Sequence, residues 1–258
     1  MRYYYLLSAL PPLSLKSEPE LTFKGLKDLL FLNLSPSDFE KLRILLRPID
    51  LYNIRALWLG QPVDERGNFS AKELEEALLV RDGLPLYLIE FLDRYETVSQ
   101  RLKAFPSLFA SLFRESEGAL RGFLGRYYRF ERERMLILTA LRAKASGRDI
   151  VKELQFEDPT DLFIANILAQ KDASDFIPEK EFEDLKILFV EKAHDPEKLN
   201  RAILEYRLKK IEEMEDNETP FSVDQVLGYV ARFIIVDSWF QLDREQGRLE
   251  VEKLSEYD

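Results

Sequence analysis

The amino-acid sequence predicts an all-α protein made of multi-helix bundle lobes, and three observations lead to this fold class. Charged residues form 33% of the chain while glycine occurs only 10 times, a composition typical of amphipathic helices with long solvated faces. Capping boxes precede several apolar runs at helical spacing. Alternation of period two over a strand length is hard to find beyond the first dozen residues.

The expected helices begin at hydroxyl residues that are followed three positions later by an acid or an amide. Three such starts are predicted, each as an N-cap residue with its partner: Ser37 with Glu40, Ser70 with Glu73, and Ser222 with Gln225. A further helix is expected over 199–215, where Leu199, Ile203, Tyr206 and Ile211 form one stripe. Glycines 118, 122 and 125 fall within a helical pattern and are interpreted as close helix packing.

Short connections separate the predicted helices, so we expect a single contiguous helical protein over residues 1–258. Breaks are expected near Pro-containing segments at 11–19, 82–85, 105–106, 158–159, 172–178, 195–196 and 215–220, and in the Gly-containing segment 60–69. Possible lobes cover 1–80, 81–155 and 156–258. The apolar start, 1–12, is interpreted as a buried element, and no apolar run approaches the length of a membrane span.

The sequence is similar to itself at a separation of 103 residues. The segment 123–130, FLGRYYRF, aligns with 226–233, VLGYVARF, and Leu, Gly, Arg and Phe coincide. A more diverged third copy is suggested at 50–60, whose acidic and apolar positions match those of 133–141. Gly147 and Gly247 are both expected to close their helices. The alternative is chance similarity between amphipathic helices, which share a period by construction.

The composition and the motifs argue against several classes of function. A net charge of −10 argues against nonspecific nucleic-acid binding. The chain has no cysteine and no glycine-rich phosphate-binding motif. His194 is the only histidine and is interpreted as part of a turn at 194–196. The segment 64–75 resembles a calcium loop but has Arg66 at the third ligand position. We therefore expect no enzyme activity, metal or cofactor.

The charged residues of the segment 126–134 are the candidate interface. Arg126, Arg129, Arg132 and Arg134 alternate with Glu131 and Glu133 along one predicted helix, and Arg126, Arg129, Glu131 and Glu133 are the candidates together with Arg232, the repeat counterpart of Arg129. Glu131 lies on the same stripe as apolar residues, where a charge needs a partner. The pattern predicts either a surface laced with salt bridges or a docking face with an ion pair between lobes or across an interface.

The stretch 128–147 resembles a recurring element of the C subunit (eukaryotic d) of the A/V-type ATPases. The matching residues are Tyr128 to Glu133 with their Glu-x-Glu pair, Arg142-Ala143-Lys144, and Gly147, while 221–229 is similar to the start of the last such helix in that family. Leu136 departs from an Asn, and Ile234 and Val236 replace both acids. The chain is shorter than typical C subunits, and its length and Tyr-rich start resemble a family encoded in bacterial V-type ATPase operons.

The resemblance implies a non-catalytic central-stalk protein. Such a protein would sit on the cytoplasmic face of the membrane ring, receive the rotor shaft, and touch the membrane only indirectly through its partners. Rotation would then couple ATP synthesis or hydrolysis to ion transport. An adaptor with unrelated protein partners has the same composition and is the alternative, and an enzyme with an unfamiliar carboxylate site is a third hypothesis.

Overall fold

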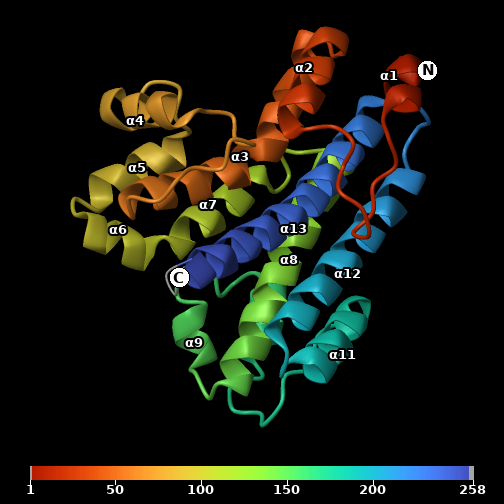
Figure 1. Ribbon diagram of the computed structural model, residues 1–258. Coiled ribbons are helices and arrows are strands. Elements are labelled where there is room, and N and C mark those ends of the chain that lie inside the picture. The colour runs from red at the N-terminus through yellow and green to blue at the C-terminus, as the bar shows by residue number, and fades with distance from the viewer. Residues whose placement is uncertain (1, 256–258) are drawn as a thin grey trace. The chain divides into compact units, whose positions relative to one another are not determined.

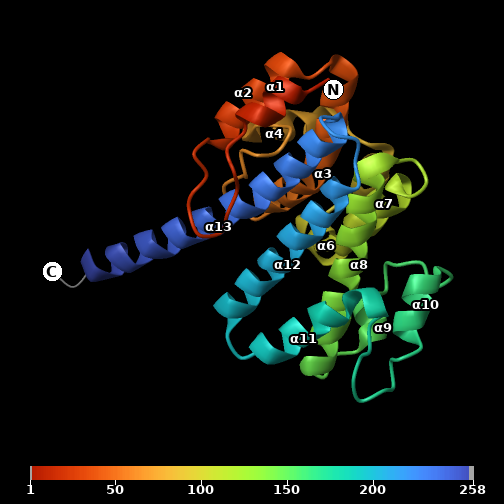
Figure 2. The same ribbon diagram turned by 90° about the vertical axis from the view of Figure 1, so that its right-hand side faces the viewer.

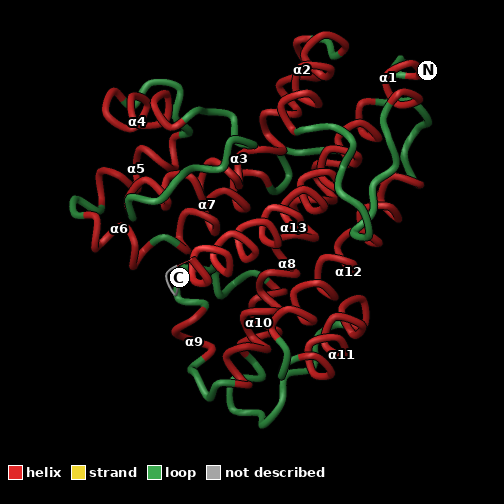
Figure 3. The backbone as a smooth tube through the Cα atoms, in the orientation of Figure 1, coloured by secondary structure: helices red, strands yellow, loops and turns green. Residues whose placement is uncertain are grey.

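The all-α class is confirmed by a computed structural model that describes residues 2–255, with the side chains of 2–242. Helices joined by short loops make up this part of the chain, and it contains no strand beyond an isolated bridge between Ser14 and Ser17 (Figure 3). The helices are α1 Tyr4–Ala9, α2 Phe23–Asn33, α3 Pro36–Trp58, α4 Ala71–Val80, α5 Leu86–Arg94, α6 Val98–Ala104, α7 Pro106–Ser116, α8 Gly122–Ala145, α9 Ile150–Glu153, α10 Leu162–Leu168, η1 Lys180–Phe182, α11 Glu183–Lys192, α12 Pro196–Asp216 and α13 Val223–Ser255.

The chain folds as two compact units rather than three consecutive segments. Unit 1 combines residues 1–42 with 195–258, and unit 2 comprises 43–194. Both expected lobe boundaries, after residues 80 and 155, therefore fall inside unit 2. The first 42 residues pack with the last helices, and such a contact between distant parts of the chain leaves no trace in local periodicity.

Helices α12 and α13 lie side by side and form the body of unit 1 (Figures 1 and 2). Arg232 of α13 donates from Nε to Glu215 Oε1 of α12 at 2.6 Å and from Nη2 to Oε2 at 2.9 Å. A Cβ at Gly228 would lie 2.2 Å from Cγ of Glu215. Glycine at 228 thus leaves room for the ion pair that joins the two helices.

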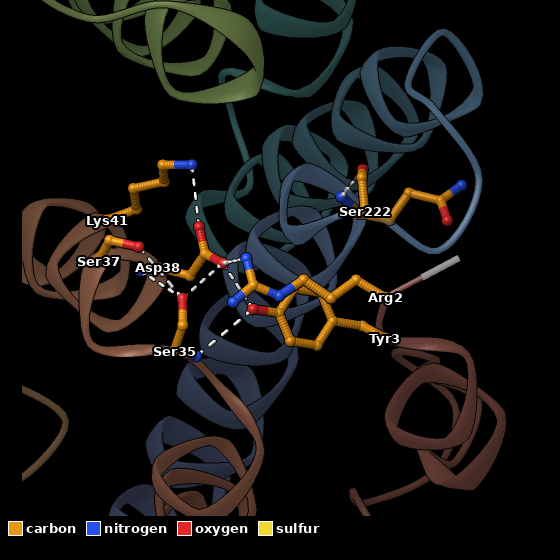
Figure 4. A network of polar contacts seen from close by, with 8 residues as sticks. Arg2, Tyr3, Ser35, Ser37, Asp38, Lys41 and Ser222 are labelled. Atoms are coloured by element: carbon orange, nitrogen blue, oxygen red, sulfur yellow. Dashed lines mark hydrogen bonds and ion pairs between the residues drawn. The ribbon is translucent and has the colours of Figure 1, made fainter.

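The N-terminal residues attach to the starts of α3 and α13 through a polar network around Asp38 (Figure 4). Asp38 is 5% exposed, and its Oδ2 accepts hydrogen bonds from Tyr3 Oη at 2.5 Å and from Ser35 Oγ at 2.9 Å. Lys41 Nζ donates to its Oδ1 at 3.0 Å. The backbone N–H of Tyr3 donates to Phe221 O at 3.0 Å, just before α13. The N-terminal segment, expected to be a buried element, is thus a short and largely exposed helix of which Leu6 is buried, and it is anchored at the buried Tyr3.

One of the three predicted helix starts is wrong. Ser70 and Glu73 form the full capping box. Ser222 Oγ accepts a hydrogen bond from the backbone N–H of Gln225, and Gln225 Oε1 accepts one from the backbone N–H of Phe221. Helix α3, however, begins at Pro36, and Ser35 is the capping residue in place of Ser37. Proline favours the first helical position, where its missing N–H costs nothing.

Helix α8 lies at the centre of unit 2 and packs against α7, α9 and α10. Residues on most of its faces are buried, which explains why its apolar periodicity is weak. A row of aromatic rings runs from α3 through α7 to α8, with centroids 4.9 Å apart for Tyr52 and Phe109, 6.3 Å for Phe109 and Phe113, and 6.0 Å for Phe113 and Tyr128.

A proline inside α3 leaves a backbone carbonyl without its helical hydrogen bond, and a side chain of α8 donates to that carbonyl. Pro48 lies within the helix and has no N–H to donate to the carbonyl of Ile44, four residues earlier. The hydroxyl of Tyr128, which is buried, donates to this carbonyl. Burial raises the pKa of Tyr128 well above its ordinary value, so the hydroxyl stays protonated and remains a donor. Helix α8 is therefore held against α3 at a defined register.

The two copies of the predicted repeat lie in different units, on α8 and on α13. Both leucines and both phenylalanines are buried, namely Leu124, Leu227, Phe130 and Phe233. Gly125 also permits a close approach, because a Cβ there would lie 2.8 Å from Leu120 O. The arginines differ, since Arg232 is paired inside unit 1 while Arg129 is exposed.

The expected ends of the repeated helices are only partly correct. Gly60 and Gly147 have φ of 65° and close α3 and α8 with the same pair of backbone hydrogen bonds, a Schellman motif. Gly247 does not close its helix, because α13 continues to Ser255. Gly118 and Gly122 are not packing positions within a helix: both have positive φ, Gly118 lies in the turn between α7 and α8, and Gly122 is the first residue of α8.

Asp38→Asn is expected to lower the free energy of unfolding by about 1–3 kcal/mol at pH 7, because charge-assisted hydrogen bonds are replaced by weaker ones. Burial works against the Asp38 charge, but hydrogen bonds from Tyr3, Lys41 and Ser35 outweigh it and lower the pKa. A carboxyl with a lowered folded pKa stabilises above its unfolded value of about 3.9 and loses this contribution below it. The difference between variant and wild type should therefore shrink below about pH 4 in urea titrations. Exposed Asp28 provides the control, since Asp28→Asn should have little effect.

Tyr128→Phe is expected to lower the free energy of unfolding by about 1–3 kcal/mol, because the Ile44 carbonyl would lose its hydrogen bond inside the protein. Thermal and urea unfolding measure this change. Tyr5→Phe removes a hydroxyl from a side chain that is 87% exposed and should leave stability unchanged. Equal stability of Tyr128→Phe and wild type would show that the hydroxyl does not satisfy Ile44.

Candidate interaction site

The five predicted interface residues lie on helices of both units. Arg126, Arg129, Glu131 and Glu133 lie on α8 in unit 2, whereas Arg232 lies on α13 in unit 1. Arg232 bonds Glu215 and, at 3.2 Å, Glu212, so it joins two helices of its own unit. The residues on α8 and their neighbours form the candidate site of unit 2.

Glu131 is buried and belongs to the interior of unit 2. Its side chain lies on the apolar stripe as expected, and the residue is 8% exposed. Arg134, one turn along the same helix, donates to Glu131 Oε2 from Nη2 at 2.5 Å and from Nε at 3.2 Å. This ion pair lies within α8, in a setting where loss of one partner would be costly.

A cleft of about 200 Å³ runs along the first half of α8, and we call it the α8 cleft. Its walls come from the end of α7, the turn before α8, α8 itself and the start of α10. The lining residues are Phe113, Ser116, Glu117, Gly118, Leu120, Arg121, Gly125, Tyr128, Arg129, Arg132, Glu133, Asp161 and Phe163. Two predicted interface residues, Arg129 and Glu133, thus lie together in one hollow, while Arg126 lies on α8 outside its lining.

Arg132 anchors the floor of the α8 cleft. Its Nη2 lies 2.9 Å from Asp161 Oδ2 and 3.4 Å from Glu157 Oε2, and all three side chains are no more than 20% exposed. Burial acts against the Arg132 charge, but Asp161 and Glu157 outweigh it and raise its pKa. Arg132 is therefore committed to internal ion pairs that hold α10 against α8.

Glu133 is half-buried in the cleft and carries an unusual pKa. Burial, followed by repulsion from Glu181, raises its pKa from 4.5 to about 7, although Arg129 acts in the opposite direction. Within the described part of the chain, its carboxylate has no hydrogen bond or ion pair. Near neutral pH the residue therefore titrates between its neutral and charged forms.

A second hollow of about 260 Å³ in unit 2 is lined mainly by aromatic and aliphatic side chains and shares Phe113 and Arg132 with the α8 cleft. Its lining residues include Tyr52, Phe105, Phe109, Met135 and Phe156. Neither this hollow nor the cluster of Arg132 with Glu157 and Asp161 can be recognised in the sequence, because their members come from separate helices. In the sequence, the spacing of Glu157 and Asp161 and the nearby charges indicate only an acidic turn.

Other chemical features of the described residues are few. No group of three or more His, Asp or Glu side chains in residues 2–242 is arranged to hold a metal ion. No helix within 2–255 combines the length and apolar character needed to cross a bilayer. His194 is exposed and lies in the predicted turn before α12.

The fold and site define an all-helical protein with a charged cleft beside its central helix. The chain belongs to the family described as Protein of unknown function (DUF2764), whose model matches residues 1–256.

Its relatives include uncharacterized proteins from chlamydiae. The protein of Chlamydia muridarum is 30% identical over 240 residues, which cover 91% of this chain and 90% of the relative. The protein of Chlamydia trachomatis is 27% identical and covers 93% of each chain. That of Chlamydia pneumoniae is 29% identical over 82% of each. No solved structure shows significant similarity to the chain.

Glu133→Gln is expected to stabilise the protein at alkaline pH. A carboxyl whose folded pKa is about 7 and ordinary value 4.5 binds its proton more tightly in the folded state, so its contribution to stability falls as pH rises through this window. At about 1.4 kcal/mol for each pKa unit the full effect at pH 8 would be about 3.5 kcal/mol, and screening by solvent at this half-buried position lowers the expected advantage of the variant to roughly 2 kcal/mol. The two should converge near pH 4.

Unfolding in urea at pH 4, 6 and 8 measures this pattern. Glu76→Gln, at an exposed position on α4, is the matched control and should show no such dependence on pH. A Glu133→Gln variant that is less stable than wild type at pH 8 would mean that the charged carboxylate has a stabilising partner.

Proposed function

We propose that the protein is a non-catalytic central-stalk component of a bacterial V-type ATPase that links the rotor shaft to the membrane ring. In this role it binds the shaft and ring proteins on the cytoplasmic side of the membrane and meets the lipid only through them. It requires no nucleotide, metal or cofactor of its own, because its task is to transmit torque between its partners during ion transport.

The observation that carries this proposal is that the stretch resembling the ATPase stalk family forms one continuous part of the structure. Residues 128–147 all lie on α8 and its closing turn at Gly147. The Glu-x-Glu pair has one buried acid, Glu131, and one acid in the cleft, Glu133. A helix with a firmly docked interior face and a charged open side suits a protein that holds a partner rigidly.

The second similar stretch, 221–229, supports the same proposal from unit 1. It covers the capped start of α13, where Phe221 has φ of 58° and accepts the hydrogen bond from Tyr3. The stretch thus forms a structured entry into the longest helix of the described chain. Burial of apolar side chains on both sides of Gly228, such as Leu227 and Tyr229, gives this helix a firm place in unit 1.

Native co-purification tests the proposal. An affinity-tagged chain, expressed from its own gene in the source organism, should recover shaft and ring proteins of the V-type ATPase after mild detergent extraction, as measured by quantitative mass spectrometry against an untagged strain. The ATPase A, B and D genes are expected beside its own gene. Recovery of unrelated proteins without any ATPase component would favour an adaptor and reject the stalk role.

A further inference from the structure

The α8 cleft contains charges of both signs that the protein itself does not pair. Arg121 and Arg129 are exposed in its lining, and Glu133 is half-buried there. Within residues 2–242, none of these three side chains makes a hydrogen bond or ion pair. Other charged side chains of the lining, such as Arg132 and Asp161, are paired within unit 2.

Arg129 and Glu133 lie close together on α8, yet no ion pair joins them. They are four residues apart on one face, but the arginine precedes the glutamate, and this order is the weaker one for an ion pair on a helix. Arg132, the other nearby cation, is held by Asp161 and Glu157. Glu179 and Glu181 add further negative charge around Glu133. No cation of the described chain forms an ion pair with the half-buried carboxylate, although Arg129 and Arg132 lower its pKa, and a partner protein could supply such a cation.

The size of the cleft limits what could supply that cation. Its volume of about 200 Å³ is smaller than the 300–1,000 Å³ typical of small-molecule sites. A hollow of this size accepts the ends of a few side chains. Cations on its exposed edge and an acid deeper inside fit a protein surface with the opposite arrangement of charge.

We infer that the α8 cleft binds a segment of a partner protein that presents a Lys or Arg side chain to Glu133 and an acidic side chain to Arg121 and Arg129. This assigns the chemistry of the partner at the site, and it rests on the proposed function only for the identity of that partner. The salt bridge to Glu133 is the more protected from water and contributes most to affinity, while the arginines at the edge guide association.

Site-specific photo-crosslinking in the source organism identifies the segment. The full chain carries a benzoylphenylalanine residue at position 121, and a second strain carries it at exposed position 76 on α4 as the control. Crosslinks formed at 121 and absent at 76 are mapped by mass spectrometry. We expect a single segment with a basic and an acidic residue within about two helical turns of each other.

Charge reversal then tests the pairing. Glu133→Lys and Arg129→Glu should each weaken binding of the identified partner at least about tenfold in a purified system, while Lys72→Glu, at an exposed position on α4 outside the cleft lining, should leave it unchanged. Reversal of the partner's basic residue should restore binding to Glu133→Lys. Arg129 is exposed, so its variant reports on binding even if the Glu133 variant proves unstable.

The outcomes separate this inference from the proposed function. A crosslinked segment with the expected charges from a protein outside the ATPase would support the cleft chemistry and reject the stalk role. Co-purification of ATPase components without any crosslink at 121, or with a segment that lacks the basic residue, would overturn the inference and leave the stalk role standing. Equal binding by Arg129→Glu, Glu133→Lys and wild type would also overturn it.

Discussion

The hydrogen bond from Tyr128 to the carbonyl of Ile44 is the constraint on which unit 2 depends. Pro48 leaves that carbonyl without its helical partner, and a buried carbonyl without a hydrogen bond is costly. The donor comes from α8, so the need created by one helix fixes the register of another. Arg129 and Glu133 follow within two turns of Tyr128. The hydrogen bond that follows from the proline in α3 thus helps to position the part of α8 that lines the cleft.

Three consecutive charged residues on α8 point in different directions, because successive residues are rotated by about 100° around the helix axis. Glu131 points into the interior and is paired with Arg134. Arg132 points toward α10 and is held by Asp161. Glu133 faces the cleft, where burial raises its pKa to about 7 and no cation of the described chain pairs with it. Interior pairs give the helix rigidity, and the remaining charge is available for a partner.

The two similar segments on α8 and α13 use their aligned positions in different ways. Glycine permits a close approach in both, to the Leu120 carbonyl in unit 2 and to the Glu215 side chain in unit 1. The arginine four residues later pairs internally at 232 but stays exposed at 129. A shared helical framework therefore supports a closed packing surface in unit 1 and an open charged one in unit 2, and this difference is what the proposed partner-binding role requires.

The sequence by itself determined the helical class, the capping box at Ser70, the turn at His194 and the burial of Glu131. Each of these features depends on neighbours within about one helical turn. The cap at Ser35 could also have been predicted from Pro36, which favours the first helical position. Only the tertiary structure decided that both chain ends form unit 1, that Tyr128 serves Ile44, and that Arg129 and Glu133 share a cleft with Asp161. These features arise from side chains of separate helices, and their meeting depends on packing that local periodicity does not encode.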